Sequence, residues 1–143
     1  AYIDAYFRQM PEIKQYMEST IDFAHKHGYV QTPFGRKCAV AGINDTNKRL
    51  AANAERVAIN APIQGGAADI IKLAMNKLAR ELKHRKMRAK MLLQVHDELV
   101  FEVPESELDA AAKLIKETME NIVDLGVPFN AELGVGNTWT EAH

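Results

Sequence analysis

The sequence has one cysteine and no long apolar run. Cys38 has no second cysteine in the chain, so an intrachain disulfide is excluded, and we expect a reducing cytoplasmic environment. No stretch approaches the ~18 consecutive apolar residues that span a bilayer. The chain does not open with the charged and then apolar residues of a signal peptide, so we expect none. We therefore expect no membrane partner. With 47% hydrophobic and 26% charged residues, the composition excludes a disordered or low-complexity chain.

Several common chemical signatures are also missing. The chain shows no Ser/His/Asp nucleophile set and no cluster of zinc ligands. Gly65 and Gly66 form the only adjacent glycine pair, but the Gly-Lys-Ser/Thr ending of a phosphate-binding loop does not follow them. Close backbone packing or a bend is the better interpretation of this pair. Hydrolases that use a serine triad and zinc enzymes are therefore poor matches.

Charge is unevenly distributed along the chain. The formal net charge is only −1, yet positions 1–90 carry 16 basic and 8 acidic residues, whereas positions 91–143 carry 2 basic and 11 acidic residues. A basic half is typical of a protein that contacts nucleic acid or another polyanion. The alternative is that solvated helix faces differ in sign for no functional reason.

Hydrophobic periodicity predicts an α+β fold. We expect helices within residues 1–28, a hairpin at residues 29–41, and a kinked helix or helix pair at residues 45–86, interrupted by Pro62. A second hairpin follows at residues 90–104, with Met91, Leu93 and Val95 alternating against their neighbours. A helix at residues 105–125 and a last strand with a tail at residues 127–143 complete the chain. Helices followed by hairpins favour an antiparallel sheet packed with several helices.

Acidic residues occupy the tip of the second predicted hairpin. His96, Asp97 and Glu98 stand between its two alternating runs. Neighbouring carboxylates point apart in a regular strand, but a tight turn can project both into the same solvent space. Oxygen ligands there suit a hard divalent cation such as Mg²⁺, which keeps several waters and substrate phosphates. The alternative is a solvated polar turn, because Asp is a common turn residue.

A row of hydrogen-bond donors lies along the long predicted helix. Arg56, Asn60 and Gln64 are spaced four residues apart and so share one face, provided that Pro62 does not rotate the second turn far. Every base pair presents acceptors in the minor groove, so donors there can test pairing geometry without reading sequence. The alternative is the polar outer face of an amphipathic helix.

Four ordered segments together resemble family A DNA polymerases, and most closely the bacterial members. Residues 94–104 read QVHDELVFEVP and are similar to the third conserved motif of that family. The helix that precedes this motif is resembled by ER at residues 55–56, AINAPIQG at residues 58–65 and AADIIK at residues 67–72, whereas Gly66 stands where the family usually has Ser or Thr. The upstream hairpin, GYVQTPFGRK at residues 28–37, and the closing segment, GVGNTW at residues 134–139, also match in order and spacing.

The resemblance implies a role for each candidate residue. Asp97 matches the second catalytic aspartate of the polymerase palm subdomain, and Glu98 matches its acidic neighbour; both would bind Mg²⁺, of which the complete enzyme uses two ions. The residues that would touch primer-template DNA near its terminus are Arg56, Asn60, Gln64 and His96. The implied reaction is two-metal phosphoryl transfer from deoxynucleoside triphosphates to a primer 3′ end, in DNA replication and repair.

The resemblance also implies that part of the catalytic machinery lies elsewhere. The family needs a further metal-binding aspartate on an earlier palm strand and a fingers helix with a nucleotide-binding lysine, and these 143 residues contain neither. We therefore expect the C-terminal palm portion of a cytoplasmic, nucleoid-associated DNA polymerase, inactive by itself. Its exposed palm surface could pair copies of the chain into a homo-oligomer. The alternative class is a non-catalytic α+β module that binds DNA or protein.

Overall fold

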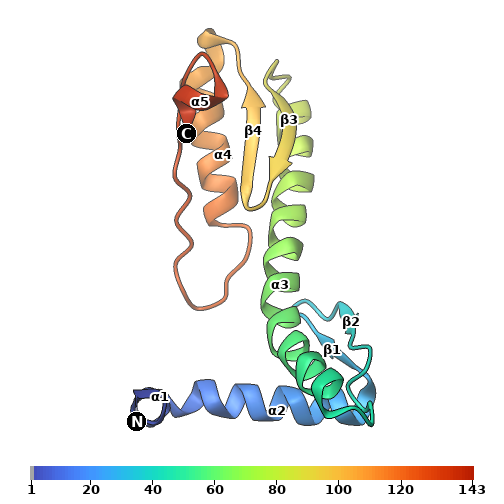
Figure 1. Cartoon of the computed structure of the whole chain (residues 1–143). Helices are drawn as coiled ribbons and strands as arrows, with labels where there is room; N and C mark the ends of the chain where they lie inside the picture. Colours follow the sequence, from blue (N-terminus) through green and yellow to red (C-terminus); the bar gives the residue numbers. More distant parts are fainter. Residues whose placement is uncertain (1) are drawn as a thin grey trace. The chain divides into compact units, whose positions relative to one another are not determined.

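The computed structural model describes residues 2–143, so that residue 1 of the predicted first helical range lies outside the described residues. Helices are combined with two separate antiparallel hairpins, as the α+β prediction required (Figure 1). The chain divides into two compact units, residues 1–66 and residues 67–143, called here the first and second units. The boundary falls inside the longest helix, α3 (Lys48–His84).

The first unit builds its core from helices and a short hairpin. Its elements are α1 (Tyr2–Gln9), α2 (Pro11–His27), β1 (Tyr29–Gln31), β2 (Lys37–Ala39) and the first part of α3. α2 starts with proline, whose fixed φ suits a first helical turn, and ends at Gly28, whose φ of 74° is left-handed. The buried apolar side chains that form the core are Ala24, Val30, Val40, Ile43, Ala54 and Ala58.

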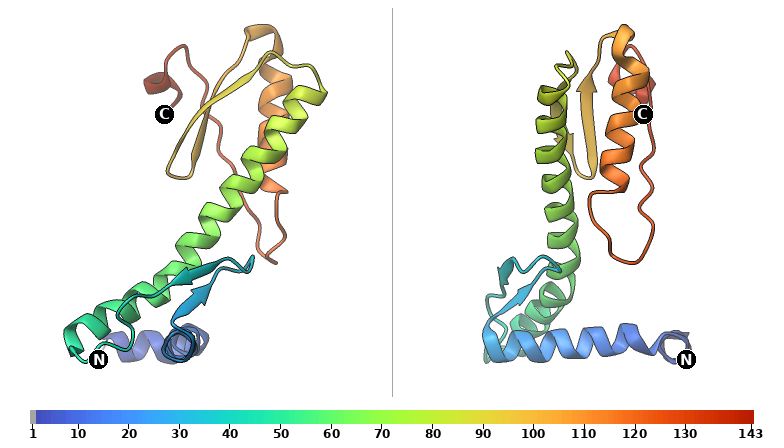
Figure 2. Two further views of the ribbon diagram at one scale, coloured as in Figure 1. Left: turned by 90° about the vertical axis from the view of Figure 1, so that its right-hand side faces the viewer. Right: turned by 180° about the vertical axis from the view of Figure 1, so that it is seen from behind.

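The second unit packs helices on the longer hairpin. Its elements are the rest of α3, β3 (Lys90–Val95), β4 (Glu98–Glu102), a 3₁₀ turn at Glu105–Glu107, α4 (Leu108–Glu120) and α5 (Trp139–Ala142). Figure 2 shows the hairpin beside the later part of α3 and beside α4. The buried core side chains are Leu78, Leu82, Ala89, Ala111, Leu114 and Ile115, against which Met91, Leu99 and Phe101 of the hairpin pack.

A β-bulge breaks the alternation of β3. Met91 pairs with Phe101, but Leu93 pairs with Val100, so one residue of β3 has no partner across the hairpin. Two residues then oppose one, and every later side chain of that strand changes face. The expected single face of Met91, Leu93 and Val95 is therefore wrong: Met91 contacts the core, whereas Leu93 and Val95 share the opposite face with Val100 and Glu98.

The predicted kinked helix or helix pair at residues 45–86 is one helix, Lys48–His84, with Pro62 inside it. Proline lacks an N–H and so removes one intrahelical donor, the one that would bond the carbonyl of Ala58. Ala54 and Ala58 are fully packed in the first core, and Pro62 itself is buried. Packing thus holds the turn before the proline in helical form, so the predicted single helix is confirmed and the predicted helix pair is wrong.

The last strand predicted within residues 127–143 is absent from the described structure, in which residues 127–137 have no strand. A strand needs a partner for its backbone groups, and here side chains of α4 take that place. The Ala131 N–H donates to Glu120 Oε1 at 3.1 Å, and Lys116 Nζ donates to the Ala131 carbonyl at 2.7 Å. The predicted helix at residues 105–125 is likewise shorter, since α4 ends at Glu120.

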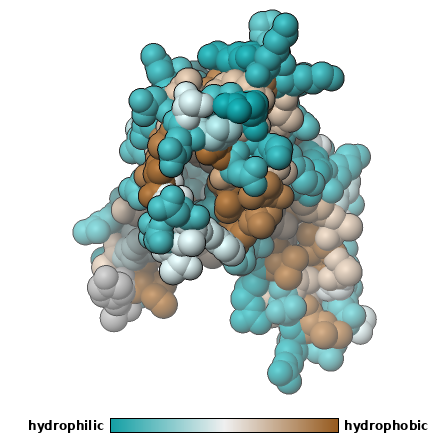
Figure 3. All heavy atoms as spheres, turned by 90° about the horizontal axis from the view of Figure 1, so that it is seen from above, coloured by the Kyte–Doolittle hydropathy of each residue, from teal (hydrophilic) through white to brown (hydrophobic). Residues whose placement is uncertain are grey.

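Hydrophobic side chains reach the surface in several places, as the view from above shows (Figure 3). In the second unit the exposed set comprises Leu73, Leu92, Leu93, Leu125, Val127, Leu133, Val135 and Trp139. Such side chains invite association, so pairing of copies through this surface stays a prediction. Among the described residues, no helix is both long enough and apolar enough to cross a membrane.

Candidate functional site

The β3–β4 turn presents Asp97 to solvent. Val95 pairs with Glu98, so the loop contains only His96 and Asp97, and both are exposed. His96 has a φ of 53°, in the left-handed region that tight two-residue hairpin loops require. Gln94 Nε2 donates to the His96 carbonyl at 2.9 Å and stabilises the turn. The Asp97 carboxylate is thus carried at the tip of a short, braced loop.

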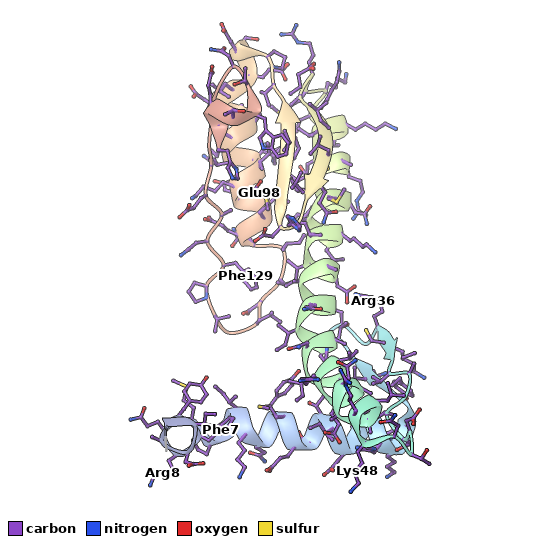
Figure 4. All side chains as sticks on the ribbon, in the orientation of Figure 1. Phe7, Arg8, Arg36, Lys48, Glu98 and Phe129 are labelled. Atoms are coloured by element: carbon purple, nitrogen blue, oxygen red, sulfur yellow. The ribbon has the colours of Figure 1, made fainter. Side chains whose placement is uncertain are left out.

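Glu98 opens β4 on the hairpin face that points away from the core. Leu99 packs into the core, so its neighbour Glu98 points the other way. His143 Nδ1 lies 3.4 Å from Glu98 Oε1, and the two side chains are 67% and 43% exposed. Figure 4 labels Glu98 on this hairpin. At this exposure the pair contributes little to stability.

Two glycines allow the closing segment of the chain to fold tightly on itself, and its last residue, His143, lies against Glu98. A Cβ at Gly134 would collide with the Ala142 carbonyl, and one at Gly136 would lie 2.5 Å from Glu141 Cβ. Thr138 caps α5 by accepting from the Glu141 N–H at 3.4 Å, and Glu141 accepts from the Asn137 N–H at 2.8 Å. A Thr-x-x-Glu pattern is a capping signal, so the start of α5 could have been found in the sequence.

The hairpin tip offers oxygen ligands but not a complete metal cage. Carboxylate oxygens are the donors that Mg²⁺ prefers, and Mg²⁺ often takes only one or two of them, with waters and phosphates completing its shell. Among residues 2–143, no group of three or more His, Cys, Asp or Glu side chains is placed to hold a metal ion. Asp97 and Glu98 are thus two carboxylates of the kind that Mg²⁺ takes, on a solvent-facing part of the hairpin.

The row of hydrogen-bond donors on α3, called here the donor row, is free to bind a ligand. Arg56, Asn60 and Gln64 all lie on α3 and are exposed. Within the described chain, their side chains make no hydrogen bond or ion pair. Tyr16 Oη donates to the Ile59 carbonyl at 2.9 Å, which supports the helix next to Pro62. Helical spacing thus places three unused donors along one side, as the sequence predicted.

Close packing supports the end of this donor row. Arg36 Nη2 donates to the Gly65 carbonyl at 2.8 Å (Arg36 is labelled in Figure 4). A Cβ at Gly65 would lie 2.7 Å from Thr32 Cγ2, closer than real Cβ atoms approach. The first hairpin therefore rests directly against the helix backbone beside Gln64. Gly65 is required by this close approach, which confirms close backbone packing as the interpretation of the glycine pair.

The tip and the donor row belong to different units. The structure brings His96, Asp97 and Glu98 together in the second unit, and Arg56, Asn60 and Gln64 together in the first. Sequence reasoning missed Gln94 and His143. Gln94 carries a weak local signal, because it stands two residues before a turn. For His143 no signal exists, since its contact joins residues far apart in the chain.

Comparisons with known proteins identify the family to which the chain is similar. A family model described as DNA polymerase family A matches residues 1–141. DNA polymerase I of Streptococcus pneumoniae serotype 4 is 50% identical over 142 residues, which are 99% of this chain and 16% of that protein. The thermostable DNA polymerase I of Thermus aquaticus is 44% identical over 142 residues, 99% of this chain and 17% of that protein.

A solved structure shares the fold. The POL domain of Pol1 from M. smegmatis, in complex with DNA primer-template and dNTP, superimposes with a TM-score of 0.93 at 40% identity, covering 98% of this chain and 25% of that one. The chain thus spans about a sixth of the length of the curated relatives named above. Because the family model covers nearly every residue, this chain belongs to DNA polymerase family A.

Proposed function

We propose that this chain is the palm portion of a DNA-directed DNA polymerase that adds deoxynucleotides to a primer 3′ end in DNA replication and repair. The observation that carries the proposal is an exposed aspartate at the tip of a two-residue hairpin loop, in a chain that belongs to this polymerase family. The DNA and dNTP bound by the M. smegmatis relative support primer-template DNA and deoxynucleoside triphosphates as partners.

In this proposal, Asp97 and Glu98 hold Mg²⁺ at the primer terminus. When bound, Mg²⁺ would supply Lewis-acid activation of the primer 3′-hydroxyl and charge neutralisation at the leaving pyrophosphate, and the complete enzyme would use two such ions. Asp97 supplies a fixed anionic oxygen, because the loop that carries it has only two residues and is braced by Gln94. A short hairpin holds such a group more accurately than a long loop would.

The donor row and His96 position the DNA. Arg56, Asn60 and Gln64 offer unoccupied donors to the minor-groove acceptors that all base pairs share, so they would test pairing geometry without selecting a sequence. His96 stands beside Asp97 with an exposed ring and would donate to the primer strand. Orienting the primer end in this way lowers the entropic cost of the reaction.

We further propose that the 143-residue chain is inactive alone, because its sequence contains neither the family's earlier metal-binding aspartate nor its nucleotide-binding helix. The complete protein works in the bacterial cytoplasm at the nucleoid, where its DNA substrate lies. A non-catalytic binding module is not proposed, because no observation in the structure favours it.

The decisive experiment is Asp97→Asn in the complete polymerase. Asparagine keeps the shape of the side chain and removes its charge, so incorporation with Mg²⁺ should fall nearly to zero while primer-template affinity stays within about threefold. Asp109→Asn is the matched control, since Asp109 is an equally exposed carboxylate on α4. Single-turnover extension and equilibrium DNA binding would be measured for both variants. Normal incorporation by Asp97→Asn would refute the assignment.

A further inference from the structure

The second unit has a basic surface that the proposed reaction does not use. Lys72, Lys77, Arg80 and Lys83 lie on the later part of α3, are exposed, and form what is called here the basic face. Because each residue of an α-helix advances by about 100°, these four side chains fall within an arc of about 140°. The buried Ile71, Ala74, Leu78 and Leu82 occupy the opposite side.

Acidic residues are few along the part of the chain that carries this face. Residues 72–90 hold eight basic residues and a single acid, Glu81. The ion pairs of this segment engage other side chains: Arg85 with Glu81, Arg88 with Glu107 and Lys90 with Glu102. Lys72, Lys77 and Lys83 have no ion pair within the described residues. Figure 4 shows side chains of this part of α3 extending away from the hairpin.

The composition of the basic face indicates the kind of partner. Protein–protein interfaces are depleted in lysine and depend on aromatic and other apolar anchors near their centre. Protein–DNA interfaces are strongly basic, and lysines that contact phosphates need no exact geometry. The basic face has three lysines and one arginine, and only Leu73 beside them is an exposed large apolar side chain. This composition matches a protein–DNA interface.

We propose that the basic face binds the phosphate backbone of DNA, as a surface made of other residues than the donor row and the hairpin tip. The contact is independent of sequence and is driven by counterion release. It goes beyond the proposed function, because none of its residues takes part in nucleotide incorporation. Its effect is to raise the affinity for DNA and to make that affinity more sensitive to salt.

The test compares two triple variants of the 143-residue chain that change its net charge equally. Lys72→Gln, Lys77→Gln and Lys83→Gln remove charge from the basic face; Lys14→Gln, Lys26→Gln and Lys113→Gln remove it from exposed lysines elsewhere. Binding to a labelled blunt-ended DNA duplex would be followed by fluorescence anisotropy from about 50 to about 200 mM NaCl. A blunt duplex offers no recessed primer end, so the hairpin-tip site contributes little.

The basic-face variant should lose affinity at least tenfold at the lowest salt, and the slope of log affinity against log salt should become shallower by up to about 3, or about 0.9 for each lost phosphate contact. The control variant should keep the slope of the unmodified chain. Replacing the same three basic-face lysines with arginine should preserve both affinity and slope, which excludes a folding defect as the cause.

Four outcomes would overturn the inference. Three concern the affinity for the duplex: an equal loss in both glutamine variants, no loss in either, or an equal loss in the arginine variant. The fourth is tighter binding of poly-glutamate than of DNA to the basic face. The last would indicate an acidic protein partner. The proposed function is tested separately, because the glutamine variant of the complete polymerase should extend primers normally at saturating DNA. Failure of the salt test would therefore leave the role of Asp97 unaffected.

Discussion

At the scale of single residues, His25 joins two parts of the first unit. Its Nδ1 lies 2.8 Å from Asn44 Oδ1, and its Nε2 lies 3.3 Å from Glu55 Oε1, one residue before Arg56 of the donor row. The hydrogen bond to Asn44 and then that to Glu55 raise the pKa of His25 above its usual 6.5. A protonated ring can donate from both nitrogens at once, which explains why the pKa of His25 is raised.

This contact predicts a pH dependence. Because the pKa of His25 is higher in the folded chain, its contribution to stability is complete below the unfolded pKa of 6.5 and is lost as the pH rises through the folded value. The free energy of unfolding should therefore fall on going from about pH 6 to about pH 8, and His25→Gln should reduce that fall. Urea denaturation at several pH values measures it, with His84→Gln as control. An unchanged pH profile in His25→Gln would contradict the prediction.

The donor row makes a prediction at the same scale. Gln64→Ala or Arg56→Ala in the complete polymerase should weaken primer extension by about 1–3 kcal/mol for each lost base-edge contact, because these side chains are exposed and have no structural partner in the described chain. The free energy of unfolding should change by less than about 0.5 kcal/mol. Gln15→Ala, an exposed glutamine on α2, is the matched control. Wild-type extension kinetics in both variants would refute the role.

At the scale of elements, the fit of α3 against the first hairpin depends on Gly65. The missing side chain leaves room for the methyl group of Thr32, which is 4% exposed and cannot move away. The Thr32 hydroxyl also accepts from the N–H groups of Phe34 and Arg36 and so shapes the hairpin loop. One glycine thus decides how closely a strand connection approaches the helix that carries the donor row.

Gly65→Ala tests this contact. Alanine favours a helix by about 1 kcal/mol over glycine, but overlap with Thr32 should cost about 1–3 kcal/mol, so the net change should be destabilising. Adding Thr32→Ser removes the clashing methyl group and keeps the hydroxyl, so the double variant should recover the loss caused by Gly65→Ala. A double-mutant cycle by chemical denaturation measures the coupling. Additive effects would show that the two residues do not collide.

Elements also show where sequence reasoning succeeds. The hairpin at His96 and Asp97 and the helical donor row were both predicted, because their signals, alternation with period two and spacing of four residues, come from the geometry of adjacent residues. The strand expected after residue 127 failed because strand formation depends on a partner. Lys116 and Glu120 take up the backbone groups of Ala131 instead, and no local pattern records that choice.

At the scale of the whole molecule, each unit has its own core. The structure also shows on which elements the basic and the acidic residues of the sequence lie. Four of the eight basic residues at positions 72–90 lie on α3 and the other four follow its end, while most acids after position 91 lie on the hairpin, on α4 and on the segments that flank α4. Glu107 joins the two regions. Burial raises the pKa of its carboxyl, but hydrogen bonds from the Arg88 backbone and guanidinium and from the Ala89 N–H outweigh this, and the net pKa is lowered.

The proposal that part of the catalytic machinery lies outside these residues predicts that the 143-residue chain does not polymerise alone. Template-directed incorporation from a labelled primer should stay at background with Mg²⁺ and all four dNTPs, because the chain lacks the remaining metal ligands and the nucleotide-binding helix of the family. The complete polymerase at equal concentration is the positive control. Measurable incorporation by the chain alone would refute the prediction.

The sequence by itself determined the helices, the two hairpins, the position of Asp97 at a turn and the shared side of Arg56, Asn60 and Gln64, because all of these follow from neighbouring residues. Only the tertiary structure decided that a bulge moves Leu93 and Val95 to the face of Glu98, that His143 lies against Glu98, and that the segment after residue 127 is no strand. These features depend on contacts between distant segments, whose free energies are set by packing and by the available partners.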